Sequence, residues 1–349
     1  MQGDASREMW PRAKPARRKL PAATDIEPDK AQRLLVVSPV RNEAPHIERT
    51  ALALAAQTRP PDLWVAVDDG STDGTAQILS RLASRLQFML VMNSQAPPGM
   101  DIGSDRLAVA AEARAFNVGL ACVPWRTFTH IAKLDGDIEL PPRYFERLLA
   151  AFGSEPALGL AGGTLRERDG RQGREDPASD YHVRGALKCY TLDCLDAIGG
   201  IEERLGWDTI DEVRARMKGF GTRTLPDLIA GHHRTCASAG GILRGTARHG
   251  ECAYITHYPL SWISLRAIRM MSKRPIVLSG LAFLGGYVRA GLTGTPRVGA
   301  PGFRAFVRRE LSARARGAFG LGAVVAKWRA SVSAFNTFYV CARQGSHPD

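Results

Sequence analysis

The sequence lacks the cysteine spacing of a zinc or redox site. Its 349 residues include six cysteines, and no two of them form a C-x-x-C pair. This pattern argues against the common zinc modules and favours free thiols in a reducing compartment. The first 30 residues carry charges and prolines but no apolar h-region. We therefore expect a flexible tail there, not a signal peptide, and a protein that faces the cytoplasm.

The sequence also lacks a hydrophobic run long enough to span a membrane. The apolar stretch from Pro275 to Val288 is shorter than the ~20 residues that a spanning helix needs. Arg289 follows it, and then comes the basic amphipathic segment GFRAFVRRELSARARGAF. This pattern favours a re-entrant or interfacial segment that contacts the membrane surface, and a helical hairpin buried in the globular core is the alternative.

Acidic residues are nearly absent from the C-terminal quarter. The chain has 47 Lys and Arg against 35 Asp and Glu, a net charge of +12. From Ser261 onward there are fourteen bases and two acids, which leaves 33 of each in the first 260 residues. The whole excess therefore belongs to the C-terminal region. It predicts a surface for an anionic partner, either a membrane leaflet or nucleic acid.

The first half of the chain alternates between apolar runs of strand length and helical segments. We expect strands at 33–40, 63–69, 87–93 and 128–135, and helices at 43–58, 70–86, 105–123 and 142–152. This alternation predicts a parallel sheet covered on both faces, and in such sheets ligands bind at the carboxyl ends of the strands. Beyond Pro156 the pattern is mixed, with strands expected at 158–165, 182–190 and 222–229 and a helix at 209–220.

Two carboxylates, Asp135 and Asp137, stand at the end of the fourth expected strand, in KLDGDIELPP. Acids this close repel each other unless a cation lies between them or hydrogen bonds satisfy them. Mg²⁺ or Mn²⁺ takes few protein carboxylates and fills its other positions with water and phosphate oxygens, so a nucleoside diphosphate would complete such a site. D-G-D alone is a common turn sequence.

Four further groups are expected at the same edge of the sheet. They are Asn42 and Glu43 after the first strand; Asp68 and Asp69 after the second; Arg114 and Asn117 on the helix before the D-G-D strand; and Asp208, Asp211 and Glu212 in GWDTIDEVRARMKGFG.

In this order, SPVRNEA, VDDGSTDGT, ARAFNVGL, KLDGDIELP and WDTIDEVRARMKGFG resemble the motifs of family 2 glycosyltransferases, from about Leu34 to His257. The resemblance implies an α/β protein of the GT-A fold, with a Rossmann-like, mostly parallel sheet flanked by helices. It also implies inverting transfer of a sugar from a nucleoside diphosphate sugar, most commonly a UDP-sugar, to an acceptor hydroxyl with Mg²⁺ or Mn²⁺. We expect a tail at 1–32, the transferase domain at 33–258, and a basic helical extension at 259–349.

Individual site residues follow from the same resemblance. It implies that Pro39 and Glu43 line the nucleoside pocket and that Asp69 hydrogen-bonds the nucleobase. Asp135 would contact the ribose and the metal, and Asp137 would bind the metal that bridges the diphosphate.

Three other positions have more than one interpretation. Arg114 would be either a phosphate contact or a solvated helix arginine. The family usually has Glu-Asp at the start of the helix in WDTIDEVRARMKGFG, but Trp207 occupies the Glu position here. Asp208 is therefore the first choice as catalytic base and Asp211 the second, with a purely structural role as the alternative for either.

His232 and His233 follow the last expected strand. One of them would complete the metal site or grip the diphosphate, or both are structural. Neighbours on a strand point to opposite faces, so both cannot serve one ion.

Absent motifs narrow the range of functions. A sugar-1-phosphate nucleotidyltransferase needs a glycine-rich loop after the first strand, and SPVRNEAP has no glycine. No Q-x-x-R-W motif of processive synthases is present, which favours transfer of a single sugar. We expect a glycan or lipid-linked acceptor of cell-envelope or exopolysaccharide synthesis, reached at the cytoplasmic face of the membrane.

Two functions without catalysis are compatible with the same sequence. One is a scaffold that keeps the fold, which the replacement of the usual Glu by Trp207 would allow. The second is a nucleic-acid binder that uses the basic C-terminal region. No nucleic acid is expected as a partner, however, because no binding module is recognisable there.

Overall fold

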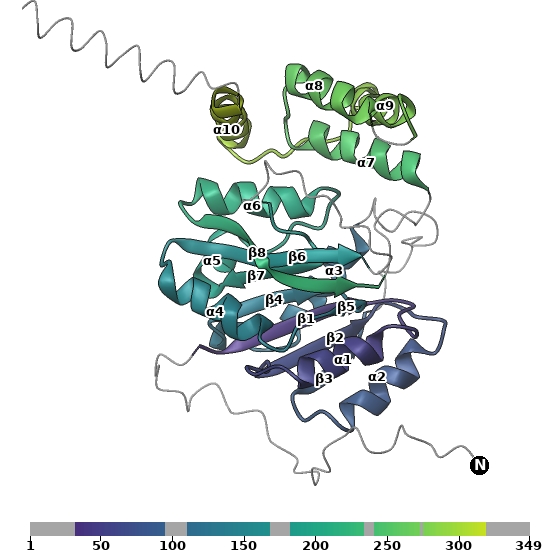
Figure 1. Ribbon diagram of the computed structural model, residues 1–349, viewed down its shortest axis with the longest axis vertical. Helices are drawn as coiled ribbons and strands as arrows, with labels where there is room; N and C mark the ends of the chain where they lie inside the picture. Colours follow the sequence, from purple (N-terminus) through teal and green to yellow (C-terminus); the bar gives the residue numbers. More distant parts are fainter. Residues whose placement is uncertain (1–31, 95–109, 168–181, 234–240, 273–274, 319–349) are drawn as a thin grey trace, which may run out of the picture. The chain divides into compact units, whose positions relative to one another are not determined.

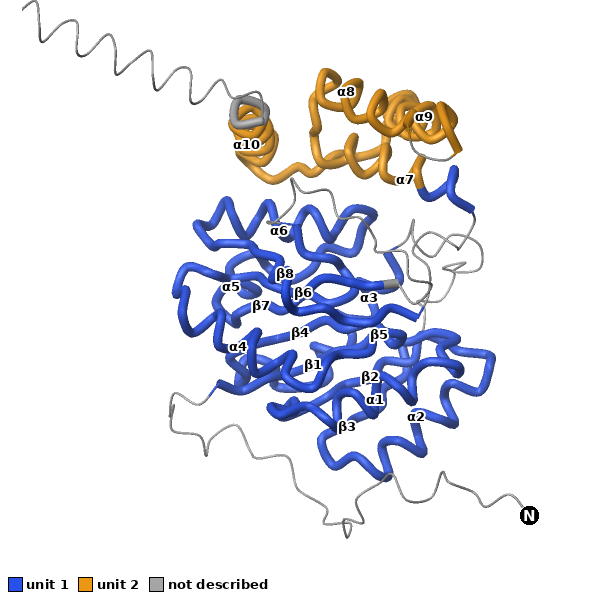
Figure 2. Tube along the Cα trace, in the orientation of Figure 1, with its two compact units in different colours: residues 1–245 blue, residues 246–349 orange. Residues whose placement is uncertain are grey.

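The computed structural model describes residues 32–94, 110–167, 182–233, 241–272 and 275–318 (Figure 1). The chain divides into two compact units, residues 1–245 and residues 246–349 (Figure 2). The first unit holds the sheet, and the described part of the second unit is helical. Most of the charged loop expected between the strands at 158–165 and 182–190 lies outside the described residues.

An eight-stranded sheet forms the centre of the first unit, in the order β3-β2-β1-β4-β7-β6-β8-β5. The strands are β1 (Leu34–Val40), β2 (Leu63–Asp68), β3 (Met89–Asn93), β4 (His130–Leu134), β5 (Ile138–Glu139), β6 (Leu158–Glu167), β7 (Leu187–Thr191) and β8 (Gly221–His232). The pairs within β3-β2-β1-β4 are parallel, as is β6 with β8. The pairs of β7 with β4 and β6, and of β5 with β8, are antiparallel. The expected α/β class with a mostly parallel sheet is confirmed.

Helices cover both faces of this sheet. They are α1 (Ile47–Ala55), α2 (Thr75–Ala83), α3 (Ala111–Ala121), α4 (Tyr144–Ser154), α5 (Leu192–Ala197) and α6 (Trp207–Met217). Side chains alternate along β1, so Leu34 and Val36 join a core with α1, α2 and α4. Leu35 and Val37 join the opposite core with α3, α5 and α6. Burial on both faces explains why the strands are continuous apolar runs.

Several boundaries differ from expectation. The strand expected at 182–190 begins only at Leu187, and α6 begins at Trp207, two residues earlier than the sequence predicted. The helix expected at 70–86 begins only at Thr75, with Gly74 as its N-cap, because the chain turns there with a φ of 90° that glycine tolerates. Asp73 still accepts a hydrogen bond from the Thr75 backbone N–H at 3.1 Å.

The second unit is a group of packed helices. It contains most of α7 (Ile242–Ile255), followed by α8 (Leu260–Met271), α9 (Leu278–Leu292) and α10 (Phe303–Ala318). Ile263 and Ala267 of α8 bury themselves against Phe283 of α9. In the described part of the chain, every helix is too short or too polar to cross a bilayer.

Two glycines set the contact between α7 and α9. A Cβ on Gly250 would overlap the carbonyl oxygen of Phe283, and a Cβ on Gly286 would overlap that of Ala247. Gly285, the neighbour of Gly286, has open space around the same position. The two helices therefore approach each other backbone to backbone.

We predict that Gly286→Ala separates α7 from α9 and destabilises the second unit by about 1–3 kcal/mol, the usual cost of overpacking. Gly285→Ala is the matched control. It should be neutral or stabilise the helix by up to about 1 kcal/mol, because alanine is the better helix former. Hydrogen exchange of the α7 and α9 amides measures both effects. Equal exchange rates in the two variants would contradict the close contact.

Candidate functional site

The loops that follow β1 and β2 are tied together by hydrogen bonds. Asn42, with a φ of 53°, donates its backbone N–H to Ser71 Oγ at 3.0 Å and accepts the Thr72 N–H on Oδ1 at 2.8 Å. The Glu43 N–H donates to Thr75 Oγ1 at 2.9 Å. The polar residues of GSTDGT therefore hold the SPVRNEA loop in place. These hydrogen bonds are a structural reason why the two motifs occur together.

The two acids of the VDDGS turn have different environments. Asp68 Oδ1 accepts hydrogen bonds from the backbone N–H and the hydroxyl of Ser71, at 2.9 and 2.6 Å, and so closes the turn. Asp69 lies 3.3 Å from the guanidinium of Arg114 on α3, and both side chains are buried. Arg114 is therefore not a solvated helix arginine. Arg114 binds Asp69, the acid that the resemblance assigns to hydrogen-bonding with the nucleobase.

The D-G-D turn lies against the loop after β1. A Cβ added to Gly136 would be only 3.1 Å from Cγ of Glu43, and the Gly136 carbonyl accepts a hydrogen bond from Thr50 of α1 at 2.8 Å. Pro39 lies half-buried in β1 opposite Val67 of β2. The fold thus brings buried Glu43 beside the turn between Asp135 and Asp137.

Asp135 is held by a buried lysine on its own strand. Lys133 Nζ lies 2.5 Å from Asp135 Oδ1, also binds the Glu112 carboxylate, and donates to the Gly185 carbonyl at 2.9 Å. The pKa of Asp135 lies well above its usual range, because burial and the Glu112 and Asp137 carboxylates raise it more than Lys133 lowers it. Negative charge at this turn is thus only partly compensated, which is the situation that a cation relieves.

Asp137 is buried beside the end of β8. Its Oδ2 is 3.3 Å from His232 Nε2, and its carbonyl accepts the His233 N–H at 3.1 Å. The His233 ring instead lies 2.9 Å from Glu139 Oε2 and stacks on His46 with ring centroids 5.6 Å apart. The adjacent histidines serve different carboxylates, as alternation along a strand requires. His46 was missed from sequence because only the fold brings it to this edge.

These residues fit a divalent metal only when a bound nucleoside diphosphate supplies further ligands. Among the described residues, no three His, Cys, Asp or Glu side chains are grouped so that they alone could hold an ion. Asp135 and Asp137 on one turn, with His232 beside Asp137, do provide the few protein donors that Mg²⁺ or Mn²⁺ uses when phosphate oxygens and water complete its shell. The turn fits a metal that arrives with a diphosphate.

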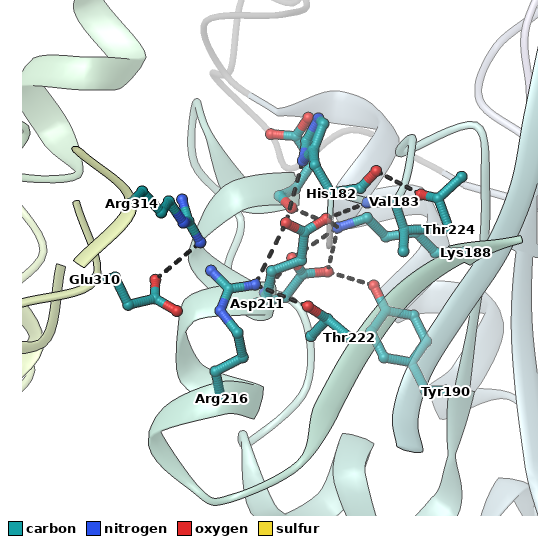
Figure 3. Close-up of polar contacts among 12 residues, drawn as sticks. His182, Val183, Lys188, Tyr190, Asp211, Arg216, Thr222, Thr224, Glu310 and Arg314 are labelled. Carbon is teal, nitrogen blue, oxygen red and sulfur yellow. Dashed lines mark hydrogen bonds and ion pairs between the residues drawn. The ribbon is translucent and has the colours of Figure 1, made fainter. Parts of the chain in front are cut away.

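A second buried lysine lies directly opposite the first. Lys188 of β7 pairs in register with Lys133 of β4. It lies 2.8 Å from Asp211 (Figure 3) and 3.1 Å from Glu212. The ring of Trp207 is 5.3 Å from Lys133 Nζ and 5.4 Å from Lys188 Nζ. The residue that replaces the family's usual Glu therefore contacts both ammonium groups by cation–π interactions.

Asp208 is the second residue of α6 and lies near Gly185. Lys188 donates to its backbone carbonyl, and a Cβ on Gly185 would lie 3.6 Å from Asp208 Cβ. Gly185 is also the residue whose carbonyl binds Lys133. The Asp208 side chain is half-buried. It is the most accessible acid of its helix.

Asp211 and Glu212 are both buried and both bound by internal partners. Asp211 accepts from Lys188 and from the Tyr190 hydroxyl (Figure 3), while Glu212 accepts the Val183 N–H at 2.8 Å and lies 3.1 Å from His182 Nδ1. Burial raises the pKa of Asp211 to about 6, against the opposing effect of Lys188. Burial also acts to raise the pKa of Glu212, but Lys188 and His182 outweigh it and lower that pKa to about 2.

Comparison with known proteins gives a match to one family model. The family model described as Glycosyl transferase family 2 matches residues 35–99, which contain the SPVRNEA and VDDGSTDGT motifs. No curated protein sequence matches the chain. The family-model match confirms the resemblance to family 2 glycosyltransferases over residues 35–99.

Several solved structures are similar at low sequence identity. The mannosyltransferase PcManGT from Pyrobaculum calidifontis, in complex with GDP-Man and Mn²⁺, is 21% identical with a TM-score of 0.49, over 83% of each chain. TarS 1-349 of S. aureus in complex with UDP is 15% identical with a TM-score of 0.47, over 75% of this chain and 72% of that one. Against a longer TarS structure, 16% identical with a TM-score of 0.47, 76% of this chain aligns but only 44% of that protein.

The two carboxylates around Lys188 make the stability of the protein depend on pH in opposite directions. The pKa of Glu212 is lowered from 4.5 to about 2, so its contribution is complete above pH 4.5 and is lost as the pH falls toward 2. The pKa of Asp211 is raised from 3.8 to about 6, so that group instead favours folding increasingly as the pH falls from about 6 to 4.

We predict that Glu212→Gln lowers the free energy of unfolding at pH 7 by about 3–5 kcal/mol, because it leaves Lys188 less compensated. The difference from the unmodified protein should shrink below pH 4.5. Asp211→Asn serves as the comparison, and it should remove the stabilisation gained between pH 6 and 4. Denaturant titrations from pH 7 to 3 measure both. A pH-independent deficit in Glu212→Gln would contradict the assigned pKa direction.

Proposed function

We propose that the protein transfers one sugar from a nucleoside diphosphate sugar to an acceptor hydroxyl, with inversion and with Mg²⁺ or Mn²⁺. The observation that carries the proposal is the D-G-D turn at the carboxyl edge of the sheet, with Glu43 on one side and His232 on the other. A hexose donor on UDP and a lipid-linked or glycan acceptor of cell-envelope or exopolysaccharide synthesis are the specific form that we propose.

The nucleoside would lie over the carboxyl ends of β1 and β2. Pro39 and Glu43 would line its pocket, and Asp69 would accept a hydrogen bond from the base. Arg114 donates to Asp69 at 3.3 Å within the buried layer. We assign Arg114 as a positioning residue that orients Asp69, in preference to a direct phosphate contact.

The diphosphate would lie over the D-G-D turn. Asp137 and Asp135 would hold the metal, and His232 lies close enough to Asp137 to orient it or to join it. The metal, when bound, supplies positive charge to the leaving diphosphate, whose negative charge grows as the sugar departs. Asp135 would also contact the ribose. Lys133 fixes the orientation of Asp135 from the buried side of the strand.

Asp208 is the side chain that we assign as general base. Inversion requires a carboxylate that takes the proton of the acceptor hydroxyl on the face opposite the leaving group. Asp208 is half-buried, and its backbone carbonyl is bound by Lys188. Asp211, by contrast, is enclosed by Lys188 and Tyr190. We therefore assign Asp211 a positioning role one helical turn below the base.

The test is turnover of a panel of UDP-, GDP- and dTDP-sugars, followed as release of the nucleoside diphosphate, with a membrane-lipid extract as acceptor. We predict metal-dependent release from one donor. Asp208→Asn should reduce turnover by about 10²–10⁴-fold, the usual contribution of a general base, and leave donor binding unchanged.

Asp211→Asn is the matched variant on the same helix. It should alter stability and leave turnover of the folded protein within about tenfold. Full turnover in Asp208→Asn would remove Asp208 as the base. Absence of release from every donor, with a correctly folded chain, would contradict the proposed activity.

A further inference from the structure

Large apolar side chains are exposed on the helices of the second unit. In the described part of the chain, twelve such side chains are exposed, and nine of them lie between Leu260 and Leu292. These nine are Leu260, Leu265, Ile268, Ile276, Val277, Leu278, Leu281, Val288 and Leu292. Exposed apolar residues scattered singly are ordinary, but this concentration within two consecutive helices and their connection marks an interaction surface.

The exposed residues of α9 form a stripe along one face. Leu278, Leu281, Val288 and Leu292, with Gly285 between them, follow the alternating spacing of three and four residues that keeps side chains on one side of a helix. The other side of α9 carries Phe283, which is buried. On α8, Leu265 and Ile268 are likewise exposed, while Ile263 and Ala267 are buried. The hairpin therefore has a packed inner face and an apolar outer face.

The charges on these helices identify the kind of partner. Helices α8 and α9 contain Arg266, Arg269 and Arg289, all exposed, and no acidic residue. A helix–helix seam with this spacing is normally flanked by charges of both signs, which pair across the interface. Glu251 of α7 lies 3.7 Å from Arg289, so one acid stands beside α9, but none lies on α8 or α9 themselves. Helices that carry cations and no acid beside an apolar stripe complement anionic lipid headgroups above the hydrocarbon of a bilayer.

We propose that the outer face of α8 and α9, here called the α8–α9 face, inserts into the headgroup region of an anionic lipid bilayer. With 15 residues, α9 is about 22 Å long and is shorter than the ~30 Å hydrocarbon core. It would therefore lie in the plane of the interface and would not span the membrane. This inference rests on the second unit alone and stands whether or not the proposed sugar transfer is correct.

The experiment is co-sedimentation of the full chain with vesicles of phosphatidylcholine, with and without phosphatidylglycerol. We expect binding to the anionic vesicles. Ile268→Ser with Leu281→Ser should weaken that binding about tenfold or more, because two aliphatic side chains that would be buried in the bilayer are lost. Ile229→Ser, which alters an exposed isoleucine of the first unit, is the matched control and should bind like the unmodified chain.

A second variant separates charge from apolar contact. Arg269→Gln with Arg289→Gln should weaken binding to the anionic vesicles about tenfold and leave binding to neutral vesicles unchanged. Circular dichroism checks that each variant is folded. No binding of the intact chain to anionic vesicles, or equal binding by the double serine variant and the Ile229→Ser control, would overturn the proposal. So would lipid-free self-association that the two serine substitutions abolish, since it would assign the face to a second copy of the chain.

Discussion

The site depends on two buried ammonium groups that face each other across β4 and β7. Lys133 and Lys188 are in register and fully buried. Together they bind four acids: Glu112, Asp135, Asp211 and Glu212. The carboxylates stabilise the charged form of the buried lysines, and the lysines stabilise the charged form of the carboxylates in return. The end of β4 and the beginning of α6 are thus fixed by one electrostatic cluster, which sets where the candidate metal-binding and base residues lie.

Trp207 is explained by this cluster. A glutamate at that position, as the family resemblance implies, would add a fifth carboxylate near the two lysines. The indole ring instead covers both ammonium groups at distances of 5.3 and 5.4 Å. Asp208, the next residue, is half-buried and lies near Gly185. The departure from the family motif therefore leaves the acid that we assign as base in position.

The sequence predicted the parts of this structure that local patterns determine. The first four strands are continuous apolar runs because both faces of the sheet are covered. The loops after β1, β2 and β4 meet because parallel strands end at one edge. The pairing of Lys133 with Lys188 depends on an antiparallel register between distant segments, and no local pattern encodes it. Helix α8 lies within the helical extension expected at 259–349, but the sequence did not give its bounds, because its exposed Leu265 and Ile268 obscure the usual polar face of an amphipathic helix.

The most direct test of the central claim, a nucleoside diphosphate site at the D-G-D turn, is titration calorimetry with UDP, GDP and dTDP, with and without Mn²⁺. We predict that one nucleotide binds tightly in the presence of metal, and that Asp137→Ala weakens this binding at least tenfold. Asp196→Ala, which alters an exposed acid of α5, should bind like the unmodified protein. If no nucleotide binds under any condition, or if Asp137→Ala binds normally, the assignment of this sheet edge as the donor site is wrong.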